Sequence, residues 1–357
     1  MNLDFHYYAT YHAARIAGFE EWQAQEIANS AQMVDELTPA LVKERKLKEE
    51  DYTLTCQGVT DNVWDEFHML SDEYGETLQK IRKVWVPFHF LPGNLPNEQI
   101  HVEYTGKKDW AGVKYQETGN ARDKRDFECM CCPNSALVTE MIRDTIEVAK
   151  REEGKGKFDI LQLIGIRMHV LADTWAHQSF VGSPNYWIND VSDVQSGETE
   201  IKHNWTSTPG ASNYEITYLG HGRIGHLPDY GYAQYSYLPK WSSVKIEVNN
   251  EQRFLSAFDQ MVKAMKCIFE DQTFAITNSR DEYMTDEIRD AITFRAKDEK
   301  EIYQHWERFT DIAPFCKEQQ SEKLMCFSNM ARYHRDFVIR YVNKAFKDHD
   351  EEPYFTE

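Results

Sequence analysis

The chain has 357 residues, a mass of 42.0 kDa and a formal net charge of −19, from 40 basic and 59 acidic side chains with 13 histidines counted as neutral. Hydrophobic residues make up 41% and aromatic residues 13%, which excludes an intrinsically disordered protein or a small disulfide scaffold. The negative surplus repels phosphate-rich partners at long range, so we expect no stable nucleic-acid binding and no docking on a strongly anionic membrane.

The sequence shows neither a membrane span nor a secretory signal peptide. The most apolar stretch, 158–175, carries Asp159, Arg167, His169 and Asp173, whereas a membrane span needs about 20 predominantly apolar residues. The N-terminal segment has no basic region and no apolar run. Since seven cysteines occur without a signal peptide, we expect reduced thiols in a cytoplasmic protein, or in one exported by a specialised secretion system.

Helical periodicity dominates the first part of the chain, with irregular segments between. Apolar spacing predicts two helices over 4–36, joined at Gly18 and Phe19. Residues 38–135 are mixed in character, and the elements expected there are a short strand at 53–59, a helix over 64–84 and a proline-marked loop at 87–96.

The remainder of the chain predicts two helices, a long loop region and a helical end. Residues 136–150 are predicted to be a helix, and 158–180 a more apolar, buried one. Residues 181–248 show no sustained helical period, so we expect long ordered loops. Periodicity returns over 251–347. The fold is therefore predicted to be mainly α, a single helical domain over 1–347, followed by an acidic tail at 348–357 that frays.

The segment His169-Val-Leu-Ala-Asp173-Thr-Trp-Ala-His177 is the most informative motif. Steps of four residues advance about 40° around a helix, so these three side chains share one face. Two imidazoles and a carboxylate on an otherwise apolar helix are costly to bury unless something pairs with them, and a divalent metal ion would do so. The alternative is that both histidines are ordinary core residues hydrogen-bonded to Asp173.

One helical face offers at most two or three ligands, so a metal site needs ligands from other elements. Acids and histidines in unusual settings are the candidates to converge on this helix. They are Asp4 and His6 near the start of the first helix, Asp35 late in the second, His89 in a proline-bounded apolar segment, and His221, His226 and Asp229 in a glycine-rich loop. Singly, each has an ordinary alternative: Asp4 can cap a helix, His89 can stack in a core, and Asp229 can begin a turn.

The other histidines are expected to have no ligand role. His12 lies about 240° around the helix from His6, and we interpret it as structural. The rest have polar neighbours and are expected to be exposed: His68, His101, His203, His305, His334 and His349.

The ordered set of candidate ligands resembles the zinc-dependent phospholipase C and P1 nuclease superfamily. The phrases Asp4-Phe-His-Tyr-Tyr, Gln32-Met-Val-Asp35, His89-Phe-Leu-Pro and Asp173-Thr-Trp-Ala-His177-Gln are most similar to a divergent zinc metallophospholipase branch of bacteria and fungi, which includes secreted effectors. The likeness spans roughly residues 4–230, with the helices of 251–347 completing the domain. It departs in one spacing, because His177 follows Asp173 by four positions and the family's second His follows by six.

The resemblance implies an all-helical domain that holds two or three Zn²⁺ ions. In secreted members the free α-amino group is itself a zinc ligand, and Asp4 is expected to take that place here. Asp173 is expected to bridge two ions, and Asp35 to act both as ligand and as general base. Two ions ~3.5–4 Å apart would activate water and stabilise the attacking and leaving oxygens of a phosphoester.

The implied function is a phospholipase C that cleaves phosphatidylcholine to diacylglycerol and phosphocholine. Tyr230, Tyr232, Tyr235, Tyr237 and Trp241 would line an apolar entrance for acyl chains, or else pack within the loop. Two or three Zn²⁺ ions leave a residual charge of about −15 to −13, which favours zwitterionic headgroups and peripheral membrane contact only. The alternatives are a P1-type nuclease or phosphatase, or a non-enzymatic effector in virulence with a structural metal site.

Other chemistries have little sequence support. Cys129-Met-Cys131-Cys132 has no second cysteine pair at zinc-finger spacing, and no signature marks a cysteine nucleophile. The only adjacent His-Asp pair, His349-Asp350, lies in the tail, and the phosphate-binding glycine motifs are absent.

Overall fold

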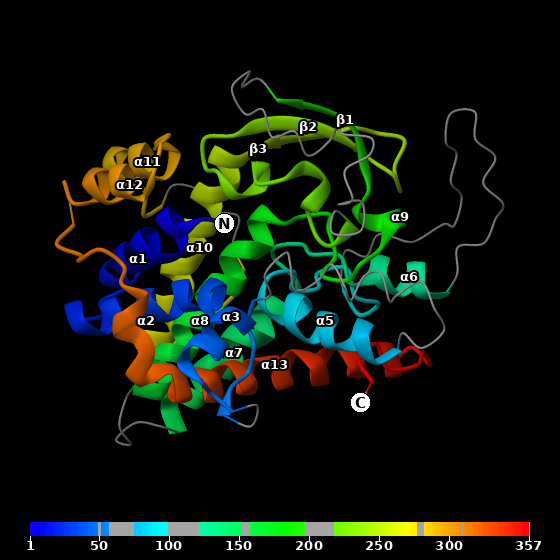
Figure 1. The fold of residues 1–357 in the computed structure, drawn as a ribbon, viewed down its shortest axis with the longest axis horizontal. Helices are drawn as coiled ribbons and strands as arrows, with labels where there is room; N and C mark the ends of the chain where they lie inside the picture. Colours follow the sequence, from blue (N-terminus) through cyan, green and yellow to red (C-terminus); the bar gives the residue numbers. More distant parts are fainter. Residues whose placement is uncertain are drawn as a thin grey trace.

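A computed structural model describes residues 1–48, 51–56, 75–98, 121–151, 158–196, 218–276, 282–308 and 310–356. Within these ranges the chain is mainly α-helical with one small antiparallel sheet, which confirms the predicted fold class (Figure 1). No helix in the same ranges combines the length and the apolar composition that crossing a membrane requires.

The helices near the N-terminus follow the predicted pattern. The first helical segment turns at Gly18, whose φ of 105° lies in the left-handed region that suits glycine. A capping box between Glu20 and Gln23 then begins the next helix. The elements are the π-helix η1 (Asp4–Ala9), α1 (Thr10–Ile16), α2 (Glu21–Glu36) and the short α3 (Pro39–Arg45).

The predicted strand at 53–59 is wrong for the part that can be compared. Residues 53–56 form no strand: the Thr55 N–H donates to Leu37 O, and the Thr53 N–H donates to the Ser328 hydroxyl. The segment therefore bonds to the end of α2 and to α13 (Leu324–Lys347) instead of to another strand. Residues 57–59 and 64–74 lie outside the described residues.

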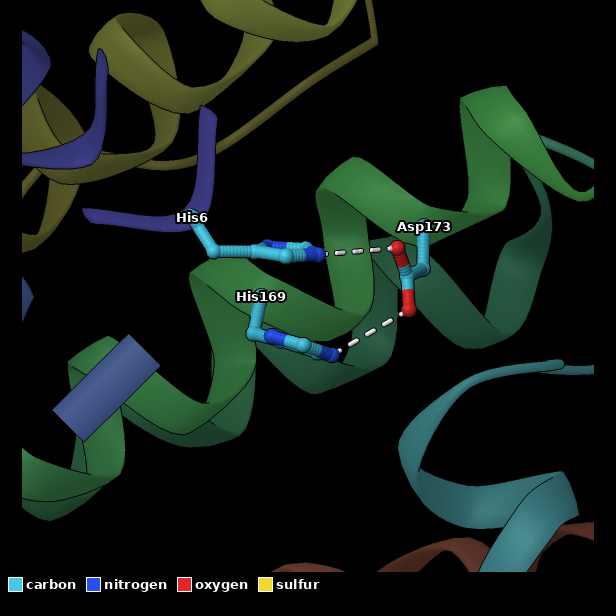
Figure 2. Close-up of side chains that lie close together, drawn as sticks. All are labelled: His6, His169 and Asp173. Carbon is cyan, nitrogen blue, oxygen red and sulfur yellow. Dashed lines mark ion pairs between the residues drawn. The ribbon is translucent and has the colours of Figure 1, made fainter. Parts of the chain in front are cut away.

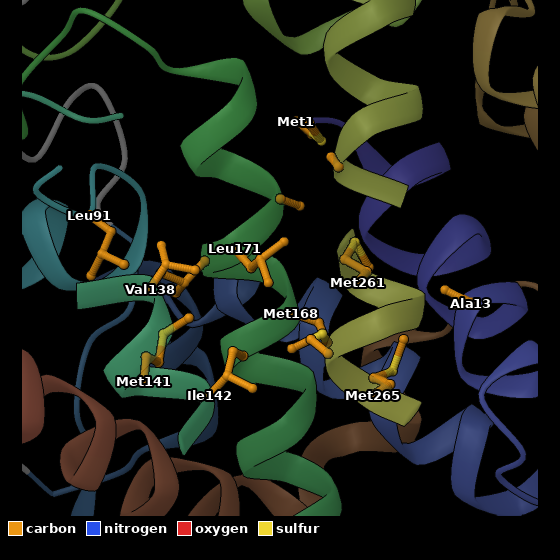
Figure 3. Close-up of a cluster of buried hydrophobic side chains, with 14 of the residues drawn as sticks. Met1, Ala13, Leu91, Val138, Met141, Ile142, Met168, Leu171, Met261 and Met265 are labelled. Carbon is orange, nitrogen blue, oxygen red and sulfur yellow. The ribbon is translucent and has the colours of Figure 1, made fainter. Parts of the chain in front are cut away.

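A central helix organises the core. α8 (Phe158–Ala176) packs against α2, α10 (Asn250–Phe269), α13 and α7 (Ala136–Arg151). Figure 3 shows buried side chains of α7, α8 and α10 meeting in one cluster, among them Met141, Leu171 and Met261. The predicted helices 136–150 and 251–347 are confirmed in outline, and the one at 158–180 ends earlier than expected. The remaining helices are α5 (Gly75–Phe88), α6 (Ala121–Glu128), α11 (Asp286–Thr293), α12 (Glu299–Trp306) and the 3-10 helix η7 (Lys317–Lys323).

One glycine sets the spacing between α2 and α8. A Cβ at Gly165 would lie 2.3 Å from the carbonyl oxygen of Ile27 and 2.7 Å from the Cβ of Ser30. Only glycine therefore lets the two helices approach this closely. The approach brings Ala31 O within 2.9 Å of the Nδ1 of His169, one turn further along α8.

The region 181–248 contains a three-stranded sheet where long loops were expected. β1 (Val191–Ser196), β2 (Gln234–Pro239) and β3 (Ile246–Asn249) pair antiparallel in the order β1-β2-β3. The strands are so short that an alternating pattern is brief, which explains why the sequence did not predict them. Short helical turns accompany them: α9 (Tyr186–Asn189), η5 (Gly222–Ile224) and η6 (Leu227–Asp229).

The acidic tail does not fray, contrary to the prediction. Tyr354 and Phe355 are 1% and 3% exposed. The Tyr354 hydroxyl donates to Asp126 Oδ1 at 2.6 Å, and the side chain of Asn343 bonds both the N–H and the carbonyl of Phe355. Two aromatic side chains therefore anchor a segment whose charged residues suggested a solvated end, and in Figure 1 this end lies beside α13.

Candidate metal centre

Helix α8 presents its three candidate ligands as the spacing predicted. His169, Asp173 and His177 are 0%, 1% and 4% exposed. Figure 2 shows Asp173 with one carboxylate oxygen turned toward His6 and the other toward His169. Each oxygen of the Asp173 carboxylate therefore contacts a different set of groups.

The two oxygens of Asp173 lie near five nitrogen atoms, the most distant being His177 Nδ1 at 3.6 Å from Oδ2. Oδ1 lies 2.6 Å from the α-amino nitrogen of Met1 and 3.2 Å from Nε2 of His6. Oδ2 lies 3.1 Å from Nε2 of His169 and 3.3 Å from Nδ1 of His89. The Asp173 carboxylate on α8 is thus contacted by the N-terminal segment, by α8 itself and by the residue after α5.

Asp35 joins the same cluster from the end of α2. Its Oδ1 lies 3.8 Å from His169 Nε2 and 3.9 Å from His89 Nδ1. Its side chain is 31% exposed, in contrast to the buried Asp173. It is therefore the more accessible carboxylate of the two.

The glycine-rich loop brings Asp229 and one of its two histidines into the site. Asp229 Oδ1 lies 3.3 Å from His177 Nε2 and 3.7 Å from His221 Nε2. His226 is 60% exposed, and its Nδ1 lies 3.0 Å from Asp229 Oδ2. His221 therefore faces inward, while His226 contacts the outer oxygen of the carboxylate.

Three sets of side chains place their ligand atoms within 4.8 Å of one another. We name them after their carboxylates. The Asp173 group is His6, His169 and Asp173; the Asp35 group is Asp35, His89 and His169; the Asp229 group is His177, His221 and Asp229. Of the predicted ligands, only Asp4 and His226 belong to none of these groups.

Four of the histidines have one ring nitrogen fixed by a backbone carbonyl. Such a bond sets the tautomer and aims the other nitrogen, which is how metal-binding histidines are oriented in proteins. The pairs are His89 Nε2 with Thr55 O at 2.8 Å, His169 Nδ1 with Ala31 O at 2.9 Å, His177 Nδ1 with His89 O at 2.8 Å, and His221 Nδ1 with Gly225 O at 2.7 Å. In every case the remaining nitrogen faces the carboxylates.

His6 is the exception, because neither of its ring nitrogens makes a hydrogen bond within the described residues. The side chain is 0% exposed, and its ring stacks on that of His169 at 3.7 Å between centroids. A buried polar group without a hydrogen bond costs about 1–3 kcal/mol. A metal ion between His6 Nε2 and Asp173 would remove the part of that cost that falls on Nε2, so the residues present fit one.

The carboxylates of the centre differ in their electrostatic settings. Burial would raise the pKa of Asp173 and Asp229, but the neighbouring histidines and the Met1 ammonium hold both pKa values well below the usual range. Burial raises the pKa of Asp35 and raises that of Asp4 to about 7. Asp173 and Asp229 are thus the carboxylates most firmly held as anions.

The histidines and the Met1 amine also differ in the direction of their pKa shifts. Burial holds the pKa of His6 well below its usual value and lowers that of His221 to about 4. Burial opposes protonation of His89 as well, but its contacts with Asp173, Cys56 and Asp35 raise its pKa well above the usual value. For the Met1 amine the charges of Asp173 and Asp229 outweigh burial and raise the pKa to about 10.

The structure places the Met1 amine, rather than Asp4, against Asp173. Asp4 is partly buried, and its carboxylate accepts a hydrogen bond from the Phe5 N–H at 2.8 Å. No side-chain pattern marks a backbone amine as a ligand, so sequence spacing alone does not reveal it.

Several histidines outside the centre differ from their predicted exposure. His305 and His334 are 3% and 0% exposed, so the prediction that they lie on the surface is wrong. Both pack against aromatic rings, Phe294 and Phe88, which bury them although their neighbours in the sequence are polar. His12 is partly buried and His349 exposed, while positions 68, 101 and 203 lie outside the described residues.

A family model matches residues 1–355. The chain belongs to the DUF6765 family, a family of unknown function. Neither the curated proteins nor the solved structures gave a match to it.

In this DUF6765 chain the three groups border one pocket of about 440 Å³. Its polar wall carries Asp35, Asp173 and Asp229, and its apolar wall is formed by Trp85, Phe90, Leu219 and Tyr230. Among the described lining residues there is no lysine or arginine. The Met1 amine, His89 and His226 are the basic lining groups whose pKa is raised, so protein cations at this pocket come from the candidate ligands themselves.

Only one residue of the predicted aromatic entrance lines this pocket, namely Tyr230. Tyr232 stacks on Tyr230 at 5.5 Å between ring centroids. Tyr235 and Tyr237 are buried in the sheet, and Trp241 packs against Phe127. Most of these aromatic residues of the DUF6765 chain thus pack against other parts of the fold and do not line the pocket.

All seven cysteines lie in the described residues, and none of them forms a disulfide there. Burial raises the pKa of the Cys129 and Cys131 thiols well above the usual value. Cys56 is different, because it lines the pocket and contacts His89. None of the candidate metal groups in the described residues contains a cysteine.

Proposed function

We propose that this chain is a zinc-dependent phosphodiester hydrolase of the phospholipase C type, acting on zwitterionic phospholipids such as phosphatidylcholine. The observation that carries the proposal is the convergence of three His/Asp groups on one pocket, with four histidines oriented by backbone carbonyls. Nitrogen and carboxylate oxygen ligands in groups of three to four suit Zn²⁺.

The ligand atoms divide naturally among three ions. His169 occurs in two groups, but its Nδ1 is bonded to Ala31 O, so its single remaining nitrogen serves one ion. We assign one ion to Asp35, His89, His169 and Asp173 Oδ2, a second to the Met1 amine, His6 and Asp173 Oδ1, and a third to His177, His221 and Asp229. Asp173 would then bridge the first two, and the amine would have to lose its proton to bind.

Bound Zn²⁺ would supply Lewis acidity, which lowers the pKa of water and neutralises the phosphate oxygens. Asp35 is suited to accept the proton of the attacking water, because its carboxylate is the accessible one and lines the pocket. Asp173 is surrounded by five nitrogen neighbours, which suits a ligand.

The remaining wall favours a substrate with an uncharged or apolar part. Trp85, Phe90 and Tyr230 present aromatic faces, and none of the described lining residues is a lysine or an arginine. The net charge of −19 disfavours strongly anionic surfaces, which favours a zwitterionic headgroup. Aromatic faces can also stack on a nucleobase, so a nuclease is the competing reading that the experiment must separate.

The test measures hydrolysis by the purified, zinc-loaded chain on phosphatidylcholine vesicles, with single-stranded RNA and a model phosphodiester beside them. We expect chelator-sensitive release of phosphocholine and diacylglycerol. Asp173→Asn should lower kcat/KM by more than about 100-fold, since even residues that only support metal ligands commonly contribute 10–100-fold. Asp290→Asn, whose carboxylate is 72% exposed and distant from the three groups in sequence, is the matched control and should leave the rate unchanged.

The outcomes separate the candidate functions. Hydrolysis of RNA but not of lipid would favour the nuclease. Zinc binding without hydrolysis of any substrate would contradict the enzyme and leave an interaction protein with a structural metal site.

A further inference from the structure

A single buried side chain holds both ends of the turn that carries Asp229. Asn250, the first residue of α10, is 0% exposed. Its Nδ2 donates to Leu227 O at 2.7 Å and to Tyr230 O at 2.8 Å. Leu227 is the first residue of η6 and Tyr230 follows its last, so one amide group spans the whole turn.

The chemistry of this position requires an amide. A side-chain amide nitrogen carries two N–H groups in one plane, and can therefore donate to two carbonyls at once. The Oδ1 of Asn250 makes no hydrogen bond within the described residues. The contribution of the side chain to this part of the fold is therefore its two donated bonds.

The Asp229 group depends on this turn more than the other groups do. The ligands of the Asp35 and Asp173 groups lie on, or directly after, the packed helices η1, α2, α5 and α8. Asp229 and His221, by contrast, lie in the short turns between α9 and β2. An aspartate in such a turn keeps its place only if the backbone on both sides of it is fixed.

We propose that Asn250 is a positioning residue for the Asp229 group. By fixing the carbonyls of Leu227 and Tyr230 it holds Asp229 Oδ1 toward His177 and His221, and so builds the third metal site. The Asp35 and Asp173 groups are held by helices instead, and the Met1 amine of the second site lies 3.4 Å from Asp229 Oδ1. This inference rests on the proposed function only in that the three groups bind metal.

The neighbouring asparagine provides a matched control. Asn249 caps α10, and its Oδ1 accepts a hydrogen bond from the Gln252 N–H at 3.2 Å. Aspartate caps helices as well as asparagine does, so Asn249→Asp keeps this contact. Asn250→Asp instead removes both donors and points a carboxylate at two carbonyl oxygens. The same chemical change is thus tolerated at one position and disruptive at the next.

The experiment counts zinc ions per full-length chain by equilibrium dialysis and elemental analysis, and records the visible spectrum of the cobalt-substituted protein. We expect three ions for the wild type and for Asn249→Asp. For Asn250→Asp we expect two tightly bound ions and a third site weakened by about 10–100-fold, with loss of one component of the cobalt spectrum.

Asn250→Ala serves as the second variant, since it removes the donors without adding a charge, and circular dichroism and melting identify the folded samples. A folded Asn250→Ala that binds three ions with wild-type affinity would overturn the inference. So would a lowered melting temperature with unchanged zinc affinity, which is what a purely structural role predicts. A wild-type chain that binds no zinc would overturn the proposed function itself, a result that is distinct from the other two.

Discussion

Buried histidines in this protein have two distinct kinds of surroundings. Those of the metal centre face carboxylates with one nitrogen, whereas His334 on α13 is surrounded by the core. Its Nε2 donates to the carbonyl of Pro87 at 2.9 Å, and its Nδ1 makes no hydrogen bond among the described residues. A neutral imidazole with its proton on Nε2 fits this arrangement. A second proton, on Nδ1, would have no hydrogen-bond acceptor among the described residues.

His334 is therefore expected to make the protein less stable in acid. Burial lowers its pKa from 6.5 to about 3 in the folded chain, so the unfolded chain binds the proton first. Stability is fully present above pH 6.5 and declines as the pH falls from there toward 3. Between pH 7 and pH 5 the wild type should lose about 2 kcal/mol more than His334→Gln, as measured by urea unfolding. Gln keeps an N–H near the carbonyl of Pro87 but does not titrate, so equal losses in both proteins would show that His334 is protonated in the fold.

Local sequence patterns could predict only part of the metal centre. His169, Asp173 and His177 were predictable because a helix converts a spacing of four into a shared face. The choice between His221 and His226 was not, because it depends on how Gly225 turns the loop: Gly225 has a φ of 57° and its carbonyl accepts from His221. Such loop geometry leaves no periodic trace in the sequence.

Two helices of the core are coupled to the metal centre through Gly165. The close contact of α2 with α8 exists because this position has no Cβ, and it places Ala31 O against His169. The spacing of the helices therefore sets both the packing of the core and the orientation of a candidate ligand.

Gly165→Ala should consequently weaken both properties. The added methyl group would meet Ile27 O at 2.3 Å, and α2 would have to move away. Overpacking of this kind costs about 1–3 kcal/mol, and we expect lower stability in urea together with weaker zinc binding, because Ala31 O withdraws from His169. Unchanged zinc affinity in a destabilised variant would show that the helix spacing and the ligand orientation are independent.

The predictability of the elements follows from their length. Helices such as α7, α10 and α13 repeat their apolar period over several turns, which explains why the sequence predicted them. The strands β1 to β3 are short, and β2 does not alternate cleanly, since its residues Tyr235, Ser236 and Tyr237 are all buried. A period of two cannot be recognised in such a segment.

At the scale of the whole molecule, the end of the chain joins parts that are distant in sequence. Asp126 on α6 accepts from the Tyr354 hydroxyl and from Arg82 on α5, both at 2.6 Å, and from Asn185 Nδ2 at 2.8 Å. The Arg82 guanidinium also lies 4.1 Å from the centre of the Tyr354 ring. α5 ends next to His89, so this network fixes one of the helices that reach the metal centre.

The buried tail predicts a large effect of changes at Tyr354. Tyr354→Ala should lower the free energy of unfolding by about 3–5 kcal/mol, because it empties an aromatic site. Tyr354→Phe should cost about 1.5–3 kcal/mol, because it removes one hydrogen bond to a carboxylate that stays bonded to Arg82. Glu352→Ala, at an exposed position two residues earlier, should change the stability by less than about 0.5 kcal/mol. Urea unfolding of the three variants measures these differences, and wild-type stability of Tyr354→Ala would restore the view that the tail frays. Any test of the tail should keep these contacts: deleting the last residues would remove Tyr354 and Phe355 and damage the fold, whereas replacing Glu351 and Glu352 alters the charge and leaves the aromatic anchors in place.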